Sequence, residues 1–475
     1  MKLLFSHSYF LFFDKKQWDQ RKPYPPLATI QVASSARSKG FDVDLFDVSF
    51  VEKADAINAK LDNYKPDVLV LYDDDFNYLT KMCLTNMREA AFQMIQEAKS
   101  RGIHVIVSSS DSTDHFEKYL GQGADEILMG EGDETLIEIL ERLREGKKTN
   151  DIDGIACKID GEVVQTKSRK ILTNLDALSL PAWDLIDITP YKKAWEKHGY
   201  FSINMATTRG CPFKCNWCAK PIYGTRYNSR SPQHVVAEMK LIKSLFSFDH
   251  IWFADDIFGL KPNWVQEFNV ELQKEGLKIP YMIQSRADLL LKDDTIDALV
   301  SSGLDEVWIG AESGSQKILD AMDKGTSLEQ IRLSTELLQR KGVKVAYFLQ
   351  FGYPGEDKKD IDSTIEMVKN YKPDDIGISV SYPLPGTLFY ERVKDQLNEK
   401  ANWKDSDDLD LMFVGEYSSA YYKVLQRYVH HWFRWKQGLS KILNGNKKVA
   451  WRYVALLPYN GLKSLTLNIK LRNHE

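Results

Sequence analysis

The chain has 475 residues, which is enough for two or three domains that each bury a core. Hydrophobic residues make up 43% of it and charged residues 27%, and these values exclude both a disordered chain and a multi-span membrane protein. The formal charge of -4 gives no overall electrostatic reason to bind nucleic acid. Three of the five cysteines lie within eight residues, which excludes a disulfide scaffold and indicates a metal site in a reducing compartment.

The N-terminus does not resemble a secretory signal. The apolar run after Lys2 is interrupted at Ser6, His7 and Ser8, and it ends at Asp14 without a small-residue cleavage site. We therefore expect a core strand with its loop at this position, and a cytoplasmic protein.

Residues 1–150 alternate short apolar runs with longer amphipathic ones. Strands are expected at 2–6, 42–48, 67–72, 104–107 and 125–129, and helices at 25–38, 51–64, 79–100 and 134–145. Such alternation predicts an α/β domain with a doubly wound parallel sheet of the Rossmann-like type. Ligands of these sheets bind beyond the carboxyl ends of the strands, so we expect a ligand-binding domain.

Residues 151–200 are expected to form a hairpin that turns at Asp160–Gly161, followed by an extended linker anchored by Trp183, Trp195 and Tyr200. In residues 201–400 the alternation resumes. Strands are expected there at 201–205, 250–253, 281–284, 306–309, 343–349 and 376–380. Six β/α units predict a partial, open (β/α)6 barrel of the TIM type, whose chemistry occurs at the carboxyl ends of the strands.

Cys211, Cys215 and Cys218 follow the first barrel strand with the spacing CxxxCxxC. Three thiolates on one loop can each bind one iron of a [4Fe–4S] cube and leave the fourth iron open to substrate chemistry. The alternatives are scattered thiols or a zinc site. Zinc would require a fourth cysteine or histidine at suitable spacing, and the nearest histidine, His234, is expected on the next helix.

This loop resembles the cluster-binding loop of radical S-adenosylmethionine (SAM) enzymes, and the order of domains resembles the branch of that family with an N-terminal cobalamin-binding domain. The resemblance covers about residues 1–400. It implies that the three cysteines hold the cluster, that SAM chelates the fourth iron, and that reduction cleaves SAM to a 5'-deoxyadenosyl radical. It also implies that Trp217 covers the cluster near the adenine, the alternative being a core aromatic.

Further residues after barrel strands match the same resemblance. Asp255 and Asp256 would lie beside the SAM amino group, and Arg286 would grip the SAM carboxylate with two hydrogen bonds. Glu312 and Ser313 would contact the ribose. Turns at 351–356 and 383–387 resemble those on the adenine side, although they are also ordinary tight turns. Each residue alone could be a solvated side chain, and their common position at one barrel end supports the assignment.

The resemblance implies that residues 1–150 bind cobalamin. The expected contacts are Ser108 and Ser110, in the loop after the fourth strand, and Gly130 and Glu131, which precede the last helix. The chain departs from the family pattern here, because serines replace a glycine-rich loop and no Asp-x-His-x-x-Gly motif supplies a lower axial histidine. The alternative is a fold that no longer holds a corrin and packs on the barrel.

Residues 401–475 form a basic, aromatic region. Between Tyr417 and His474 there is no Asp or Glu, whereas there are 11 Lys and Arg residues. Apolar side chains recur at helical spacing at Tyr421, Leu425, Tyr428, Trp432, Trp435, Leu439 and Ile442. Such a helix could make peripheral contact with an anionic membrane or cover an anionic, lipid-like substrate, the alternative being a helix that packs on the barrel.

These features predict a cobalamin-dependent radical SAM enzyme that methylates an unactivated carbon of a small molecule, with an electron donor such as flavodoxin or ferredoxin. One alternative is a radical SAM cyclase or rearrangement enzyme, because the domain order also resembles anaerobic Mg-protoporphyrin ester cyclase. Another is a non-catalytic cluster- or corrinoid-binding sensor or carrier. Methylthiotransferases, which hold a second cluster on three more cysteines, are excluded because only Cys83 and Cys157 remain.

Overall fold

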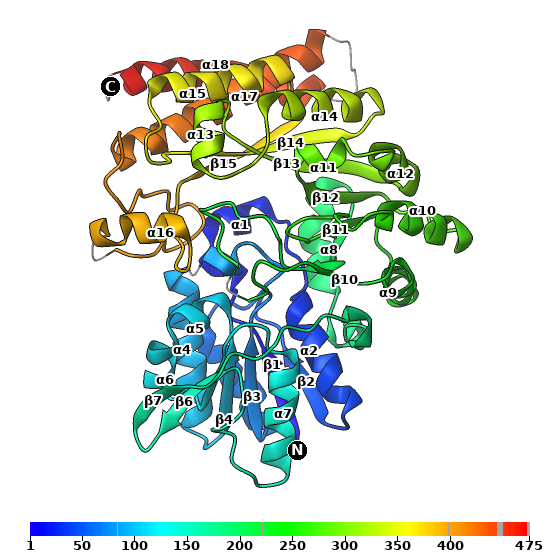
Figure 1. Ribbon diagram of the computed structural model, residues 1–475, viewed down its shortest axis with the longest axis vertical. Helices are drawn as coiled ribbons and strands as arrows, with labels where there is room; N and C mark the ends of the chain where they lie inside the picture. The colour runs from blue at the N-terminus through cyan, green and yellow to red at the C-terminus, as the bar shows by residue number, and fades with distance from the viewer. Residues whose placement is uncertain (83, 221, 398–399, 444–449, 473–475) are drawn as a thin grey trace.

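The computed structural model describes residues 1–82, 84–220, 222–397, 400–443 and 450–472 (Figure 1). Cys83, Lys447, Lys448 and His474 lie outside these residues, so the structure does not test what the sequence suggests for them. The chain forms a seven-stranded sheet, a six-stranded sheet and a pair of long C-terminal helices. In Figure 1 the seven-stranded sheet lies at the bottom and the helix pair at the top.

The N-terminal sheet has the parallel core that the sequence predicts. Its strands run in the order β2-β1-β3-β4-β5-β6-β7, of which the first five are parallel. They are β1 (Lys2–Ser6), β2 (Asp42–Phe46), β3 (Val68–Tyr72), β4 (His104–Ser108) and β5 (Glu126–Leu128). The helices are α1 (Lys15–Gln20), α2 (Leu27–Ser38), α3 (Ile57–Tyr64), α4 (Thr85–Lys99), α5 (Ser110–Asp114), α6 (Phe116–Gly121) and α7 (Asp133–Arg144). All five residues of β3 are buried, as expected for a strand covered on both faces.

The predicted hairpin consists of β6 (Ile155–Ile159) and β7 (Glu162–Gln165). Asp160 and Gly161 have φ angles of 52° and 87°, and two positive values are what a two-residue hairpin turn requires. The hairpin extends the N-terminal sheet, because β6 pairs antiparallel with β5.

The linker differs from the extended segment that the sequence predicts. Residues Thr189–Trp195 form a helix, α8, which Pro190 can begin because its missing N–H is not needed in the first turn. Trp183 and Trp195 are buried anchors, as predicted. Tyr200 is not, since it is 39% exposed.

The second sheet is an open half-barrel, as predicted. Its strands are parallel and follow chain order, with β8 and β15 at the two edges. They are β8 (Ser202–Met205), β11 (His250–Phe253), β12 (Tyr281–Ser285), β13 (Leu304–Glu312), β14 (Lys344–Phe351) and β15 (Asp375–Val380). Its helices are α9 (Pro232–Leu245), α10 (Trp264–Lys274), α11 (Ala287–Leu290), α12 (Thr295–Ser302), α13 (Gln316–Ala321), α14 (Leu328–Arg340), α15 (Lys358–Tyr371) and α16 (Leu388–Val393), and β9 (Thr208–Arg209) pairs with β10 (Asn228–Ser229).

The C-terminal region forms two helices, α17 (Ser419–Leu443) and α18 (Ala450–Arg472). α17 packs on the half-barrel, and its buried face is partly the predicted one. Tyr421 and Leu425 are buried as expected, and Tyr428 and Trp432 are partly buried against the core. The most deeply buried side chains after Leu425 are Val429 and Phe433, which the sequence did not single out. In the described part of the chain, every helix is too short or too polar to cross a membrane.

Candidate functional site

The three cysteines lie on the loop that follows β8 and β9, at the carboxyl end of the half-barrel. Gly210 begins this loop with a φ of 77°, and a Cβ atom there would overlap the carbonyl oxygen of Arg226. Only glycine therefore fits this sharp turn. Cys211, Cys215 and Cys218 carry free, partly buried thiols.

Two of the three thiols, those of Cys211 and Cys218, have raised pKa values. Burial raises the pKa of Cys211, and burial together with Asp256 raises the pKa of Cys218 to about 12. A metal must replace these protons to bind. Within the described residues, no three His, Cys, Asp or Glu side chains converge on a single-ion site. The thiolates of a cluster instead each bind a separate iron.

Asn216, which the sequence did not single out, anchors the cysteine loop. Its Nδ2 donates to the Ala321 carbonyl at 2.7 Å and to Asp323 at 2.8 Å, and its Oδ1 accepts from the Tyr353 hydroxyl at 2.7 Å. Its backbone N–H donates to the Met322 carbonyl. The loop is thereby tied to segments after β13 and β14, which fixes the position of the cysteines on either side of it.

Arg286 points at the cysteine loop from the end of β12. Its Nη1 lies 4.0 Å from the Sγ of Cys215, and its guanidinium lies 3.8 Å from the ring centroid of Phe213. Asp288 and the Gly325 carbonyl accept from its remaining N–H groups. The arginine is buried and held in one orientation.

Glu312 ends β13 in the left-handed region, with a φ of 57°. Its Oε1 pairs at 2.7 Å with the Nζ of Lys324, and both side chains are buried. Burial lowers the pKa of Lys324, but Glu312 and Cys215 raise it more, so the lysine is charged. Lys324 was not predicted as a site residue, because a single lysine in a loop carries no local sequence signal of a binding site.

The other predicted SAM-site residues are also near this loop, but several have partners of their own. Asp255 accepts four hydrogen bonds from the N–H and hydroxyl groups of Thr207 and Thr208, which accounts for its lone pairs. Ser313 bonds to Thr364 and to the Ser315 N–H. The indole N–H of Trp217 is buried and finds no partner among the described residues.

The carboxyl ends of the two sheets face each other. Lys81, between β3 and α4, pairs at 2.5 Å with Asp256, which follows β11. Phe76 stacks on Tyr223, with ring centroids 5.6 Å apart. A ligand bound beyond the N-terminal strands would therefore lie next to the cysteine loop.

The sequence places Ser108 and Ser110 in a loop, whereas in the structure Ser108 ends β4 and Ser110 begins α5, and this edge of the N-terminal sheet offers unused polar atoms. Ser108 Oγ and Asp75 Oδ2 are buried and have no hydrogen-bond partner in the described part of the chain. Ser110 Oγ donates to the other oxygen of Asp75 at 3.4 Å. Burial, with Asp73 adding to it, raises the pKa of Asp75 well above its usual range.

Gly130 and Glu131 join the N-terminal sheet to the cysteine loop. Glu131 and Asp133 pair with Arg209 at 2.6 Å and 2.7 Å, and all three side chains are buried. The second oxygen of Glu131 accepts from the Leu172 N–H at 2.6 Å. Gly130 has a φ of 80°, which makes the turn before α7 possible. Arg209 precedes Cys211 by two residues, so this buried ion network positions the cysteine loop.

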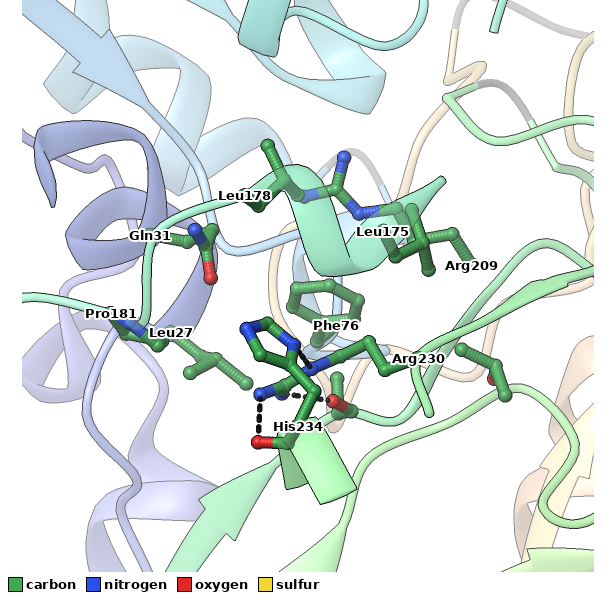
Figure 2. A pocket seen from close by; sticks show the side chains of 11 residues that line it. Leu27, Gln31, Phe76, Leu175, Leu178, Pro181, Arg209, Arg230 and His234 are labelled. Carbon is green, nitrogen blue, oxygen red and sulfur yellow. Dashed lines mark hydrogen bonds between the residues drawn. The ribbon is translucent and has the colours of Figure 1, made fainter. Parts of the chain in front are cut away.

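A small cavity lies behind this network (Figure 2). It is lined by Leu27, Gln31, Phe76, Leu175, Leu178, Pro181, Ala206, Thr208, Arg209, Arg230 and His234, so it opens between α2, the linker and the barrel. Arg209 lines this cavity, but the three cysteines that follow it in the chain do not. The ring Nδ1 of His234 accepts from Arg230 at 3.0 Å, so the histidine considered as a zinc ligand has a partner here.

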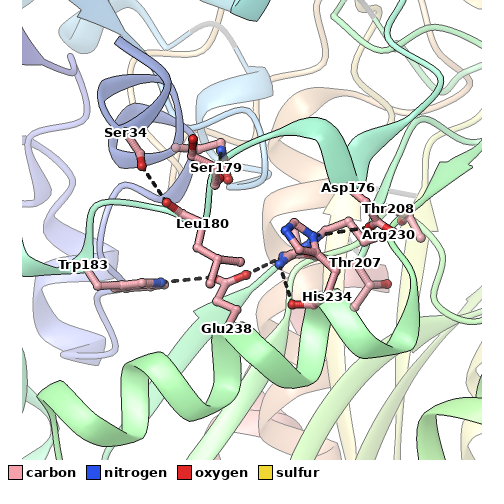
Figure 3. Close-up of polar contacts among 12 residues, drawn as sticks. Ser34, Asp176, Ser179, Leu180, Trp183, Thr207, Thr208, Arg230, His234 and Glu238 are labelled. Carbon is pink, nitrogen blue, oxygen red and sulfur yellow. Dashed lines mark hydrogen bonds and ion pairs between the residues drawn. The ribbon is translucent and has the colours of Figure 1, made fainter. Parts of the chain in front are cut away.

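The linker is fastened on both sides of this cavity (Figure 3). Ser34 of α2 donates to the Leu180 carbonyl at 2.6 Å, and the indole of Trp183 donates to Glu238 of α9 at 3.0 Å. Glu238 also pairs with Arg230. The linker therefore holds the N-terminal sheet against the first unit of the barrel.

Comparison with known proteins agrees with this arrangement. The model of the Radical SAM superfamily matches residues 205–368, which include the cysteine loop, Arg286 and Glu312. These residues form a radical SAM domain, which implies SAM and a [4Fe–4S] cluster.

The chain is similar to several curated proteins, three of which are an uncharacterized methyltransferase, a cyclase and a methylase. An uncharacterized methyltransferase of Pyrococcus horikoshii is 26% identical and aligns over 60% of this chain and 62% of its own length. The anaerobic magnesium-protoporphyrin IX monomethyl ester cyclase of Rubrivivax gelatinosus is 24% identical over 79% of this chain and 67% of its own. The hopanoid C-3 methylase of Methylococcus capsulatus is 26% identical over 79% and 70%.

Solved structures share the fold. The cobalamin-dependent SAM radical enzyme OxsB superposes with a TM-score of 0.75 at 16% identity, over 98% of this chain and 72% of its own. The radical SAM methyltransferase TsrM from Kitasatospora setae superposes with a TM-score of 0.70 at 17% identity, over 83% and 76%. The fold class predicted from the sequence, a Rossmann-like sheet followed by a radical SAM half-barrel and a helical tail, is confirmed.

Proposed function

We propose that the protein is a cobalamin-dependent radical SAM enzyme that methylates an unactivated carbon. The observation that carries this proposal is the cysteine loop at the carboxyl end of the half-barrel, with a buried arginine aimed at it and the Rossmann-like sheet edge opposite. When bound, the cluster and SAM supply a carbon-centred radical, and cobalamin supplies a methyl group.

Different residues of the chain would bind the cluster and SAM. Cys211, Cys215 and Cys218 hold the cluster. Arg286, fixed beside Cys215, would bind the carboxylate of SAM through its Nη1, and the Glu312–Lys324 pair would offer both charges to the polar groups of SAM. Asp255 keeps Thr207 and Thr208 in place, so we assign it a positioning role and leave the SAM amino group to Asp256.

The N-terminal sheet fits a corrin through its unused polar atoms. Ser108 Oγ and Asp75 Oδ2 are buried without partners at the edge that faces the cysteine loop, and such atoms are costly unless a ligand or water satisfies them. Ser110 and Gly130 lie at the same edge as further candidate contacts. The side chain of Glu131 is committed to Arg209, so we propose that it supports the pocket from behind.

The relatives include a cyclase as well as methyltransferases, and the cyclase supports a second candidate function. The cyclase among them favours oxidation or ring closure at the same site, in place of methyl transfer. The mass of the product separates the two, because methylation adds a CH2. The hopanoid methylase supports a lipid-like substrate, and the basic C-terminal region supports an anionic one at a membrane surface. Flavodoxin or ferredoxin is the proposed electron donor.

The test is to measure iron and cobalt in protein made with corrinoid and purified without oxygen, and then to look for 5'-deoxyadenosine under strong reduction. About four irons and one cobalt per chain, with 5'-deoxyadenosine formed, support the proposal. Iron without cobalt refutes the methyl-transfer mechanism. An intact cluster that forms no 5'-deoxyadenosine favours a sensor or carrier.

A further inference from the structure

The last helix, α18, turns several large apolar side chains outward. Leu462, Leu465 and Ile469 are 65%, 63% and 62% exposed, and Leu456 and Tyr459 are 46% and 50% exposed. Steps of three or four residues place these five side chains along one half of the helix surface. In Figure 1, α18 lies at the end of the molecule farthest from the N-terminal sheet.

The opposite half of α18, which packs on α17, mixes small and polar side chains with leucines, of which Leu471 is buried. The Oδ1 of Asn460 lies 2.9 Å from the ring Nδ1 of His431 on α17, and Gly461 lies against the indole of Trp435. Ser464 is buried. A helix whose outer side meets only water carries polar residues there, whereas the outer side of α18 carries leucine and isoleucine. An outward apolar face of this kind marks a surface that something other than water covers.

The positive charge of the C-terminal region indicates which kind of partner covers the apolar face of α18. From 418 to 474 the chain has no acidic residue, and on α18 the side chains of Lys463, Lys470 and Arg472 are exposed. The Nζ of Lys463 lies 5.8 Å from the ring centroid of Tyr459, directly beside the apolar face. A second copy of the chain would bring two such positive regions together, whereas an anionic bilayer offers hydrocarbon and negative charge at the same place.

We propose that α18 docks the protein on membranes that contain anionic phospholipid, with Leu462, Leu465 and Ile469 inserted at the headgroup boundary. The helix lies in the plane of the surface, and its lysines reach the phosphates along their flexible stems. The sequence pointed to Trp432 and Trp435 of α17 for this contact. The structure moves it to α18, because α17 is packed between the half-barrel and α18. Docking deepens the proposed function, since it would bring a lipid-like substrate to the barrel.

The test is flotation of the full chain, with its cluster reconstituted, on two kinds of vesicle. One kind is phosphatidylcholine alone, and the other contains phosphatidylglycerol as well. We expect binding to the second kind that weakens with added salt. The variant Leu462→Ser/Leu465→Ser/Ile469→Ser should bind roughly tenfold or more weakly, because each buried CH2 contributes to the membrane affinity.

The matched control is Leu245→Ser/Val270→Ser/Val414→Ser, which removes apolar side chains that are 42%, 59% and 80% exposed elsewhere on the chain. It should bind like the unchanged protein. Equal losses in both triple variants, or equal binding to both kinds of vesicle, would overturn the proposal. So would a dimer in solution that only the α18 substitutions dissociate. Formation of 5'-deoxyadenosine without vesicles is scored separately, so failure of the proposed function is distinguishable from failure of docking.

Discussion

Arg209 offers a quantitative test of how the N-terminal sheet positions the cysteine loop. It is 6% exposed and contacts Glu131 at 2.6 Å and Asp133 at 2.7 Å, so Arg209→Met would leave two buried carboxylates without a cation. Removing one partner of a buried ion pair costs about 3 to 5 kcal/mol. We expect a loss of that size in the free energy of unfolding, together with a lower iron content, because Cys211 follows two residues later.

Arg332 on α14 provides the matched control. It also contacts two carboxylates, Glu329 and Glu336, both at 2.6 Å, but all three side chains are solvent-accessible. Exposed pairs contribute about 0 to 1 kcal/mol, so Arg332→Met should change the unfolding free energy little and leave the iron content unchanged. Urea unfolding followed by tryptophan fluorescence measures both variants. Equal losses would show that burial of the network is not what makes it important.

Three further predictions concern the half-barrel. Asn216→Ala removes the hydrogen bonds that hold the cysteine loop and should lower the iron bound per chain; a normal iron content at unchanged stability would contradict the anchoring role. Gly310→Ala places a Cβ 2.6 Å from the Nζ of Lys324, so SAM affinity measured by equilibrium dialysis should fall, whereas Gly121→Ala, which meets nothing within 4 Å, should leave it unchanged. Glu356 is buried, and burial raises its pKa from 4.5 to about 8, so the folded state keeps a proton that the unfolded state loses. Stability should therefore fall as pH rises from about 5 to 8, and Glu356→Gln should flatten this dependence in thermal melts; an unchanged slope would refute the assignment.

Much of the fold was predictable because its signals are local. Apolar runs bounded by turn residues located all six barrel strands, and His250–Phe253 matches β11 at both ends. The spacing of Cys211, Cys215 and Cys218 within one loop needs no tertiary information. The Asp160–Gly161 turn was recognisable because positive φ angles favour these residue types.

The partners of the site residues were not predictable, because they come from distant parts of the chain. Asn216 bonds to residues more than 100 positions later, and Lys81 meets Asp256 across 175 positions. The sequence predicts Glu131 as part of a ligand-binding turn. Only the packing of the two sheets shows that its carboxylate pairs with Arg209.

The sequence by itself determined the order of the strands in both sheets, the cysteine loop and the basic character of the tail. Tertiary structure decided which faces are covered. α17 carries apolar side chains around much of its surface, and packing on the half-barrel buries Val429 and Phe433 more fully than Tyr428 and Trp432. On α18 packing buries Ser464 and Leu471 and leaves Leu462 and Leu465 outside. Helical periodicity shows that a helix has two sides, but burial depends on the neighbours that each side meets, and the chain brings those neighbours from far away.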